Sequence, residues 1–233
     1  MTVMIGYMLQ GTVITLEIFF LTLLFALPLA LPVTFGRMSK NFILSGIIKF
    51  YLLIMRGTPL ILQLIFVYFA PKYLFQFMNL ALGDYITSPY FWNVIRAMLS
   101  YDRFTATIVA FSLNYAAYFA EIYRGGIESI SQGQYEAAKV LGFTRSQTFT
   151  RIIMPQMIKR ILPAIGNETI TLVKDTALSQ TIGVLELFHM ARTASAREFS
   201  TMPIFVAGVF YLVMNWLVTI TYAKFEKKLS YYS

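Results

Sequence analysis

The chain has 233 residues, of which 58% are hydrophobic, 16% aromatic and 13% charged, and its mean hydropathy is +0.65. This balance excludes an ordinary water-soluble domain and predicts an integral membrane protein. The lack of cysteine excludes disulfides and thiolate metal sites, and a single histidine cannot form a histidine cluster. The net charge of +8 comes from basic residues in short clusters between apolar stretches, which indicates membrane topology rather than binding of nucleic acid.

Five stretches come close to the roughly 20 apolar residues that a helix needs to cross about 30 Å of hydrocarbon. The sequence therefore predicts an all-α membrane protein that forms one transmembrane domain over residues 1–233. The first ten residues carry no charge, so the first span is expected to stay in the mature protein rather than act as a cleaved signal. The predicted spans are residues 10–34, 50–72, 104–124, 161–182 and 203–224.

The loops between the spans predict the orientation. Basic residues gather between the first and second spans, between the third and fourth, and after the fifth, whereas acidic residues dilute them in the other loops. We therefore expect the amino terminus outside and the carboxyl terminus in the cytoplasm. The outer loop that begins at Pro71 contains "FQFMNLAL" and "YFWNVIRAML", which indicate short amphipathic pieces in the membrane interface.

A polar, basic stretch at residues 134–155, "QYEAAKVLGFTRSQTFTRIIMP", lies on the predicted cytoplasmic side. Apolar residues recur at helical spacing up to Gly142, which stands where a helix stop is expected. Thr144 and Gln147 are in capping-box register for a second helix, which is expected to end at Pro155. Such a hairpin can dock into a groove on another protein, or it can rest on anionic lipid headgroups. A DNA-binding helix-turn-helix is disfavoured because the segment is tethered between spans.

The order of residues in this stretch resembles the EAA loop of permease subunits of bacterial ATP-binding cassette importers. The matching pattern is Glu136-Ala137-Ala138, three residues, Gly142, nine residues, Ile152, one residue and Met154-Pro155. The family usually has leucine before the proline, so Met154 is a mild departure that keeps an apolar side chain. "RGTPLILQL" at 56–64 and "LPAIGNETITLVKDTALSQTIGVLEL" at 162–187 are similar to the polar amino acid permeases within that superfamily.

The resemblance implies that the loop at about 130–158 is a coupling-helix pair that docks into a separate ATP-hydrolysing subunit. It implies contact with that subunit through Glu136 and a sharp turn at Gly142, within a coupling set of Glu136, Ala137, Ala138, Gly142, Arg145 and Pro155. The chain has no G-x-x-x-x-G-K-[ST] motif, so we expect no enzyme activity and no cofactor here, with ATP and magnesium bound by the partner. The implied partners are an ATPase dimer, a second permease subunit that is identical or similar, an extracytoplasmic substrate-binding protein and the lipid of a bacterial inner membrane.

The fourth predicted span carries charges that are costly in hydrocarbon. One interpretation is mutual neutralisation, in which Lys174 pairs with Asp175 or with Glu121 of the third span. The other is a substrate pathway, because Glu168, Thr171 and Asp175 lie at i, i+3 and i+7 and place two carboxylates and a hydroxyl on one helix face. Two acidic groups favour a cationic amino acid. Weaker candidates for the pathway are Ser179 and Gln63.

Two other function classes remain as alternatives. An integral membrane enzyme would use Glu168 and Asp175 as a carboxylate pair or metal site, but a third ligand is missing and the cytoplasmic hairpin is left unexplained. An ion-driven secondary transporter would normally show an internal repeat within one chain. The sequence therefore favours the permease subunit of an amino acid importer, in which two such subunits enclose the pathway.

Overall fold

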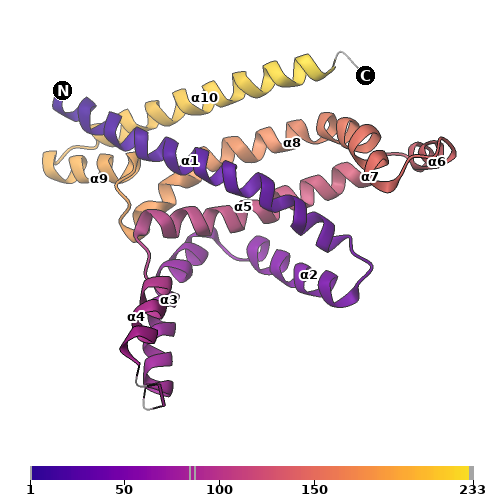
Figure 1. The fold of residues 1–233 in the computed structure, drawn as a ribbon. Coiled ribbons are helices and arrows are strands. Elements are labelled where there is room, and N and C mark those ends of the chain that lie inside the picture. Colours follow the sequence, from indigo (N-terminus) through magenta and orange to yellow (C-terminus); the bar gives the residue numbers. More distant parts are fainter. Residues whose placement is uncertain (1, 84, 87, 231–233) are drawn as a thin grey trace.

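The computed structural model describes residues 2–83, 85–86 and 88–230, and its elements are all helices (Figure 1). In chain order they are α1 (Thr2–Arg37), α2 (Phe42–Gly57), α3 (Leu60–Leu82), α4 (Pro89–Leu99), α5 (Arg103–Glu128), α6 (Gln132–Val140), α7 (Arg145–Thr148), η1 (Phe149–Ile153), α8 (Met154–Asp175), η2 (Thr176–Ile182), α9 (Leu187–Glu198) and α10 (Met202–Ser230). The predicted all-α class is confirmed.

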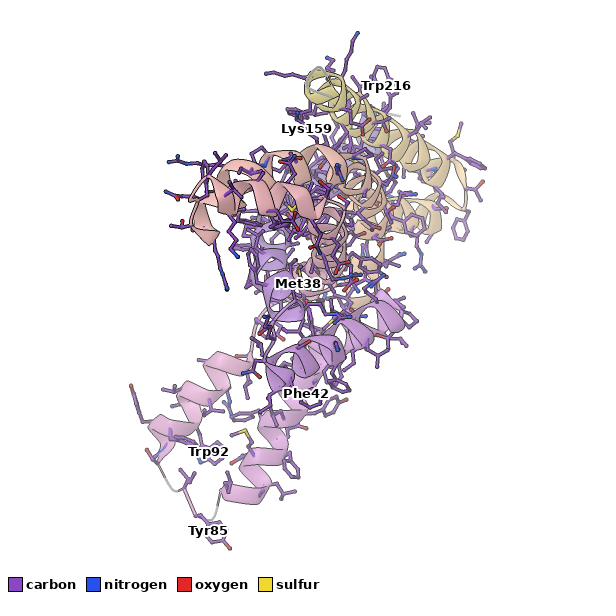
Figure 2. The ribbon with its side chains drawn as sticks, turned by 90° about the vertical axis from the view of Figure 1, so that its right-hand side faces the viewer. Met38, Phe42, Tyr85, Trp92, Lys159 and Trp216 are labelled. Atoms are coloured by element: carbon purple, nitrogen blue, oxygen red, sulfur yellow. The ribbon has the colours of Figure 1, made fainter. Side chains whose placement is uncertain are left out.

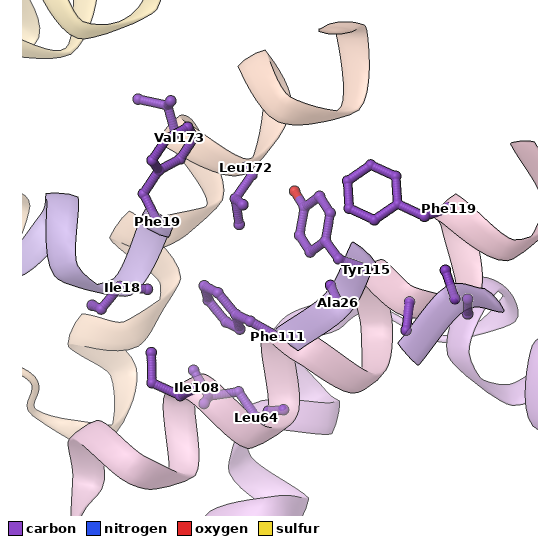
Figure 3. Close-up of a cluster of buried hydrophobic side chains, with 14 of the residues drawn as sticks. Ile18, Phe19, Ala26, Leu64, Ile108, Phe111, Tyr115, Phe119, Leu172 and Val173 are labelled. Atoms are coloured by element: carbon purple, nitrogen blue, oxygen red, sulfur yellow. The ribbon is translucent and has the colours of Figure 1, made fainter. Parts of the chain in front are cut away.

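Helix α5 lies at the centre of the bundle. Its first turn is capped by Asp102, whose carboxylate accepts a hydrogen bond of 2.9 Å from the backbone N–H of Thr105. Large side chains of α5 meet those of α1 and α8 in the core, which Figure 3 shows for Phe111, Tyr115, Phe119, Ile18, Phe19, Leu172 and Val173. Burial of this apolar cluster holds the long helices together.

Glycines let the helices of the bundle approach closely. A Cβ atom at Gly126 of α5 would lie 2.2 Å from the side chain of Ile161 on α8, so only glycine fits there. On the other side of α8, Gly166 packs against the ring of Tyr222 from α10. The hydroxyl groups of Tyr222 and Thr169 are 2.9 Å apart and link α8 to α10. These approaches fix α8 between α5 and α10.

The second predicted span is interrupted in the structure. Helix α2 ends at Gly57, and α3 begins at Leu60 after the extended Thr58 and Pro59, because proline has no N–H to donate and holds the residue before it extended. The helix then runs through Pro71 to Leu82, so the expectation of a loop from Pro71 is wrong.

Helices α3 and α4 form an arm that projects from the bundle, and Tyr85 and Trp92 lie toward its far end (Figure 2). The segment "FQFMNLAL" belongs to α3, and "YFWNVIRAML" belongs to α4. The second piece is helical as expected, whereas the first is the continuation of a long helix rather than a separate interfacial piece. The two helices of the arm contact each other through Phe75 and Trp92, whose ring centroids are 6.0 Å apart.

Three described helical segments are long and apolar enough to cross a membrane, namely Ile5–Arg37, Leu60–Leu82 and Met202–Leu229. The predicted third and fourth spans are helical too, but they are less apolar. Helix α5 buries Thr107, Ser112 and Asn114 inside the protein, so these positions do not face lipid and need not be hydrophobic. The five-span count remains a prediction.

Candidate functional site

The hairpin between α5 and α8 turns at Gly142. Its φ angle of +76° lies in the left-handed region, which costs a residue with a Cβ roughly 1–2 kcal/mol. The turn closes α6 with two backbone hydrogen bonds, from the N–H of Gly142 to the carbonyl of Lys139 (3.1 Å) and from the N–H of Phe143 to that of Ala138 (3.0 Å). The predicted helix stop is thus confirmed, and its cause is the backbone angle.

The second helix of the hairpin begins with the predicted capping box. The backbone N–H of Gln147 donates to the hydroxyl of Thr144 (3.3 Å), and the backbone N–H of Thr144 donates to the Gln147 side chain (2.9 Å). These reciprocal bonds satisfy donors that the first turn of α7 would otherwise leave open. The turn at Gly142 and the capping box of Thr144 and Gln147 together give the hairpin a defined shape.

The surface of the hairpin mixes charge with unpartnered apolar groups. Ala138 is fully buried against the rest of the hairpin, whereas Glu136, Ala137 and Arg145 are exposed. Two apolar side chains of the same turn are largely exposed, Val140 at 87% and Leu141 at 72%. Exposed apolar groups beside charges are typical of a surface that contacts another protein.

The second helix does not end at Pro155, which corrects the expectation from the sequence. Helix α7 passes into the π-helical turn η1, and α8 begins at Met154 with Pro155 in its first turn. Proline cannot donate an N–H within this helical path, but the π turn directly before it shifts the hydrogen-bond register and relieves the contact with the preceding carbonyl. A continuous helical path therefore runs from Arg145 to Asp175.

The acidic face of α8 has the predicted helical geometry. Glu168 and Asp175 are partly buried, and Thr171 between them is exposed. The hydroxyl of Tyr115 on α5 donates to Oδ2 of Asp175 at 2.7 Å. Glu168 forms no hydrogen bond or ion pair with another residue in the described part of the chain, although Asp175 and Arg56 lie near enough to interact with it electrostatically. Much of the hydrogen-bonding capacity of this face is unused.

The two weaker pathway candidates are already engaged inside the protein. Ser179 is fully buried and donates to the carbonyl of Thr176 at 2.8 Å. The side-chain amide of Gln63 donates to the carbonyls of Met55 (3.0 Å) and Thr58 (3.1 Å), and its oxygen accepts from Asn114 at 2.9 Å. Gln63 therefore bridges the break between α2 and α3 to α5, and the structure does not join it to the acidic face.

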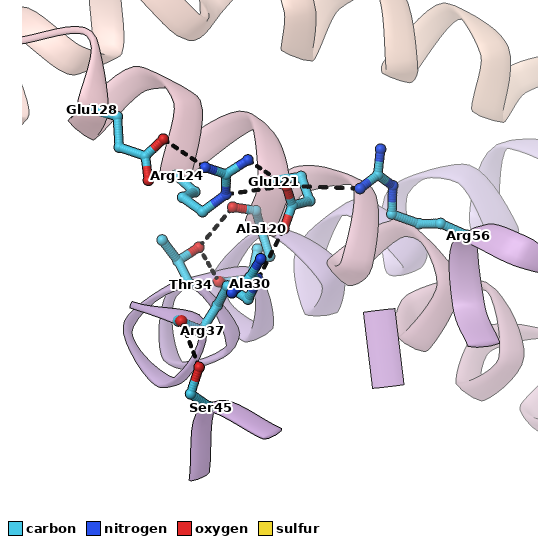
Figure 4. A network of polar contacts seen from close by, with 9 residues as sticks. All are labelled: Ala30, Thr34, Arg37, Ser45, Arg56, Ala120, Glu121, Arg124 and Glu128. Carbon is cyan, nitrogen blue, oxygen red and sulfur yellow. Dashed lines mark hydrogen bonds and ion pairs between the residues drawn. The ribbon is translucent and has the colours of Figure 1, made fainter. Parts of the chain in front are cut away.

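A charge network that the sequence did not reveal lies at the ends of α1, α2 and α5 (Figure 4). Glu121 contacts three arginines, Arg37 at 3.8 Å, Arg56 at 3.7 Å and Arg124 at 2.8 Å. Arg124 also pairs with Glu128 at 2.5 Å. The pairing of Lys174 with Asp175 or Glu121 was one of two interpretations, and it is absent from the ion pairs of the described residues. Glu121 is occupied by arginines, and Lys174 is exposed but near enough to Asp175 to interact with it electrostatically.

Comparison with known families assigns the chain. A model described as binding-protein-dependent transport system inner membrane component matches residues 23–231. The chain belongs to this family. It is therefore a transport permease, a membrane subunit rather than an enzyme, and ATP and magnesium are the ligands of the partner ATPase. Among the described residues, no three histidine, aspartate or glutamate side chains are grouped as a metal site requires.

Curated relatives and solved structures are similar over nearly the whole permease. The nopaline transport system permease protein NocM of Agrobacterium fabrum is 35% identical over 206 residues, or 88% of this chain and 80% of the relative. The arginine transport system permease protein ArtQ of Bacillus subtilis is 34% identical over 226 residues, or 97% of this chain and 93% of the relative. A chain in the crystal structure of an amino acid ABC transporter with histidines has a TM-score of 0.78 at 28% identity, covering 96% of this chain and 94% of that one. These matches favour the permease over the membrane-enzyme and ion-driven alternatives.

One buried carboxylate of the permease differs from its sequence interpretation. Glu186 follows the fourth predicted span, where acidic residues were expected only to dilute the basic ones, but it is fully buried and caps α9. It accepts hydrogen bonds of 2.7 Å from the backbone N–H groups of Phe188 and His189 and of 2.8 Å from the hydroxyl of Tyr211. An acidic residue directly before a helix is the signal that would have indicated this role.

Proposed function

We propose that this permease forms the substrate pathway of an ATP-driven amino acid importer and is moved by a separate ATPase through the hairpin of α6 and α7. The proposal for an amino acid substrate draws on relatives named for the transport of nopaline, octopine, arginine, glutamine and cystine. The observation that carries the coupling role is the exposed turn at Gly142, which combines a rigid left-handed backbone with unpartnered apolar side chains.

The proposed docking surface is the outer side of α6 and the turn. Glu136 and Arg145 supply opposite charges for orientation, and Val140 and Leu141 supply apolar area that no other part of the described chain covers. Ala137 is small enough for close approach of a partner helix, while Ala138 is buried and supports the hairpin itself. Pro155 acts indirectly in this proposal, by starting α8 immediately beyond the π-helical turn.

The membership of the family implies an ATPase and an extracytoplasmic substrate-binding protein as partners in an inner membrane. Beyond this, we propose that two permease subunits, identical or closely similar, enclose the pathway, with the amino terminus outside and the carboxyl terminus in the cytoplasm. The basic loops support this orientation, because they include the hairpin that must reach a cytoplasmic ATPase.

The proposed substrate contact is the acidic face of α8. Asp175 and Glu168 would bind a cationic or ammonium group, and Thr171 would accept or donate a hydrogen bond between them. The support is that both carboxylates are partly buried and that, among the described residues, the hydrogen bond from Tyr115 to Asp175 is the only one they accept. Thr171 is exposed and donates to the carbonyl of Asn167 at 3.0 Å, so its hydroxyl oxygen can still accept a hydrogen bond. Ser179 and Gln63 remain in the proposal only as supports, since both are occupied within the chain.

The test of coupling compares two glycines of the hairpin. Gly142→Val forces a branched side chain into the left-handed region, whereas the matched control Gly133→Val places the same side chain at an open position of α6 without a positive φ. In reconstituted complexes we expect Gly142→Val to lose about tenfold or more of the ATP hydrolysis stimulated by loaded binding protein, in line with roughly 1–2 kcal/mol of strain. Membrane levels of the subunit should stay normal. Full stimulation in Gly142→Val would contradict the coupling role.

A further inference from the structure

A long groove of ≈ 1100 Å³ runs between α1, α8 and α10. Its walls are apolar side chains such as Phe19 of α1 and Leu217 of α10, and Val173 of α8 lies at its floor. Figure 1 shows α1 and α10 close together near the amino terminus and farther apart toward the end of the molecule that holds α6 and α7. The lining of the groove includes Thr169 and Val173 of α8 but none of the three residues of the acidic face, so the groove is not part of the proposed pathway.

The hydroxyl groups in the groove are already hydrogen-bonded within the described chain. Thr12 donates to the carbonyl of Met8 (2.7 Å), Thr221 donates to that of Leu217 (2.8 Å), and Thr169 bonds Tyr222. The hydroxyl oxygen of the remaining threonine, Thr15, accepts from the backbone N–H of Leu187 at 3.2 Å. A polar substrate would find few unused partners here, whereas a hydrocarbon chain needs none.

Basic residues lie beside the lining face of α10 toward its carboxyl end, where Phe225 and Leu229 still line the groove. Thr221 lines the groove, and Lys224 and Lys228 follow it at i+3 and i+7, so all three lie on one stripe of the helix. Both lysines are exposed. Glu226 lies on the opposite side of α10 at this helical spacing, so it does not neutralise the stripe. The widening end of the groove is therefore positively charged.

We propose that this groove binds an anionic phospholipid, with an acyl chain between α1 and α10 and the phosphate headgroup at Lys224 and Lys228. Apolar walls without free hydrogen-bonding groups suit the acyl chain, and a basic mouth at the end of a membrane helix suits an anionic headgroup. Val213 and Leu217 are 47% and 54% exposed within the chain and would be covered by the lipid. The site is distinct from the contact with the ATPase and from the substrate pathway.

The experiment measures phospholipid bound to the purified permease–ATPase complex by native mass spectrometry. The complex is equilibrated in mixed micelles that contain phosphatidylglycerol or phosphatidylcholine. We expect phosphatidylglycerol to be retained in preference, and Lys224→Gln and Lys228→Gln each to weaken that retention about fivefold. Lys49→Gln on α2 is the matched control, because Lys49 is exposed and lies outside the groove.

A second pair of variants tests the acyl chain. Val213→Trp fills the groove and should lower retention of both lipids, whereas Leu212→Trp, at a neighbouring position 68% exposed and outside the groove, should leave retention unchanged. Equal effects of the two tryptophans, or equal retention of the two lipids, would overturn the proposal. If Val213→Trp instead separates two permease subunits, the groove is a protein contact and the lipid site is wrong. Because the lysine variants alter only exposed side chains, they remain informative even if Val213→Trp does not fold.

Discussion

Two groups of acidic side chains in this permease differ in how far other residues of the chain neutralise them. Glu121 on α5 contacts three arginines from three helices, and its side chain is only 17% exposed. Glu168 and Asp175 on α8 have, between them, one hydrogen bond from the hydroxyl of Tyr115. Among the described residues, the first group is neutralised by arginines, whereas the second keeps carboxylate oxygens that accept no hydrogen bond.

The contrast separates charges that hold the fold from charges that are available to a ligand. An acidic side chain at membrane depth costs roughly 2.5–3.5 kcal/mol, so it persists only where something offsets that cost. Around Glu121 the offset is the arginines, which join the ends of α1 and α2 to α5. On α8 the offset is incomplete within the chain, which supports the proposal that a substrate completes it.

The largest expected effect comes from breaking the first group. Glu121→Gln leaves Arg37, Arg56 and Arg124 close together without their shared counter-charge, so we expect a loss of about 2–3 kcal/mol in the free energy of unfolding, less than for a fully buried pair because the arginines are partly exposed. The measurement is the thermal unfolding midpoint of the purified complex. Glu128→Gln is the matched control, because Glu128 is 53% exposed and contacts Arg124 alone, so its removal should cost under about 1 kcal/mol. Similar midpoints for both variants would refute a structural role of Glu121.

An intermediate effect on stability is expected at Gln63, an uncharged side chain that is hydrogen-bonded within the chain. Gln63→Leu removes the bonds from the Gln63 amide to Met55 and Thr58 and leaves the buried amide of Asn114 with only its bond to the Met55 carbonyl, which should cost about 1–3 kcal/mol. Gln76→Leu on the exposed side of α3 is the control and should change the unfolding midpoint little. If Gln63→Leu abolished transport while stability stayed normal, Gln63 would belong to the pathway rather than to the fold.

The last variant, at Asp175, is expected to have the smallest effect on stability and a large effect on transport. Asp175→Asn keeps the shape of the side chain and can still accept from Tyr115, but it removes a poorly compensated charge. We expect an unchanged or raised unfolding midpoint together with a loss of roughly tenfold or more in uptake, the size of a lost hydrogen bond to a charged group. Glu17→Gln, which makes the same kind of change at an exposed carboxylate of α1, is the control for both measurements. A destabilised Asp175→Asn with normal uptake would place Asp175 with Glu121, among the structural charges.

Local features of the site could be predicted from the sequence, whereas contacts between distant segments could not. The capping box of Thr144 and Gln147 and the left-handed turn at Gly142 depend on residues within a few positions, and both are present. The network of Glu121 joins Arg37 and Arg56, which are far away in the sequence. Which arginine reaches which carboxylate depends on how the helices pack, and a single sequence does not contain that information.

Prolines were the main source of error in the predicted elements. Pro59 does mark a break, but Pro71 lies inside α3 and Pro155 lies in the first turn of α8. Proline removes one hydrogen bond and crowds one carbonyl, so a long apolar helix in a membrane can tolerate it. Burial was not a source of error: the small and polar residues of α5 face protein rather than lipid and lower its hydropathy, yet the predicted span at 104–124 lies within this helix.

The helical path from α7 through η1 into α8 is uninterrupted, so the second helix of the hairpin and the acidic face belong to one continuous helical segment. Helix α8 has 22 residues, which corresponds to about 33 Å at 1.5 Å per residue. A small tilt imposed at the hairpin end of α8 would therefore reach Glu168 and Asp175 without a loop that could absorb it. The π turn beside Pro155 is the place where this helical segment would bend first.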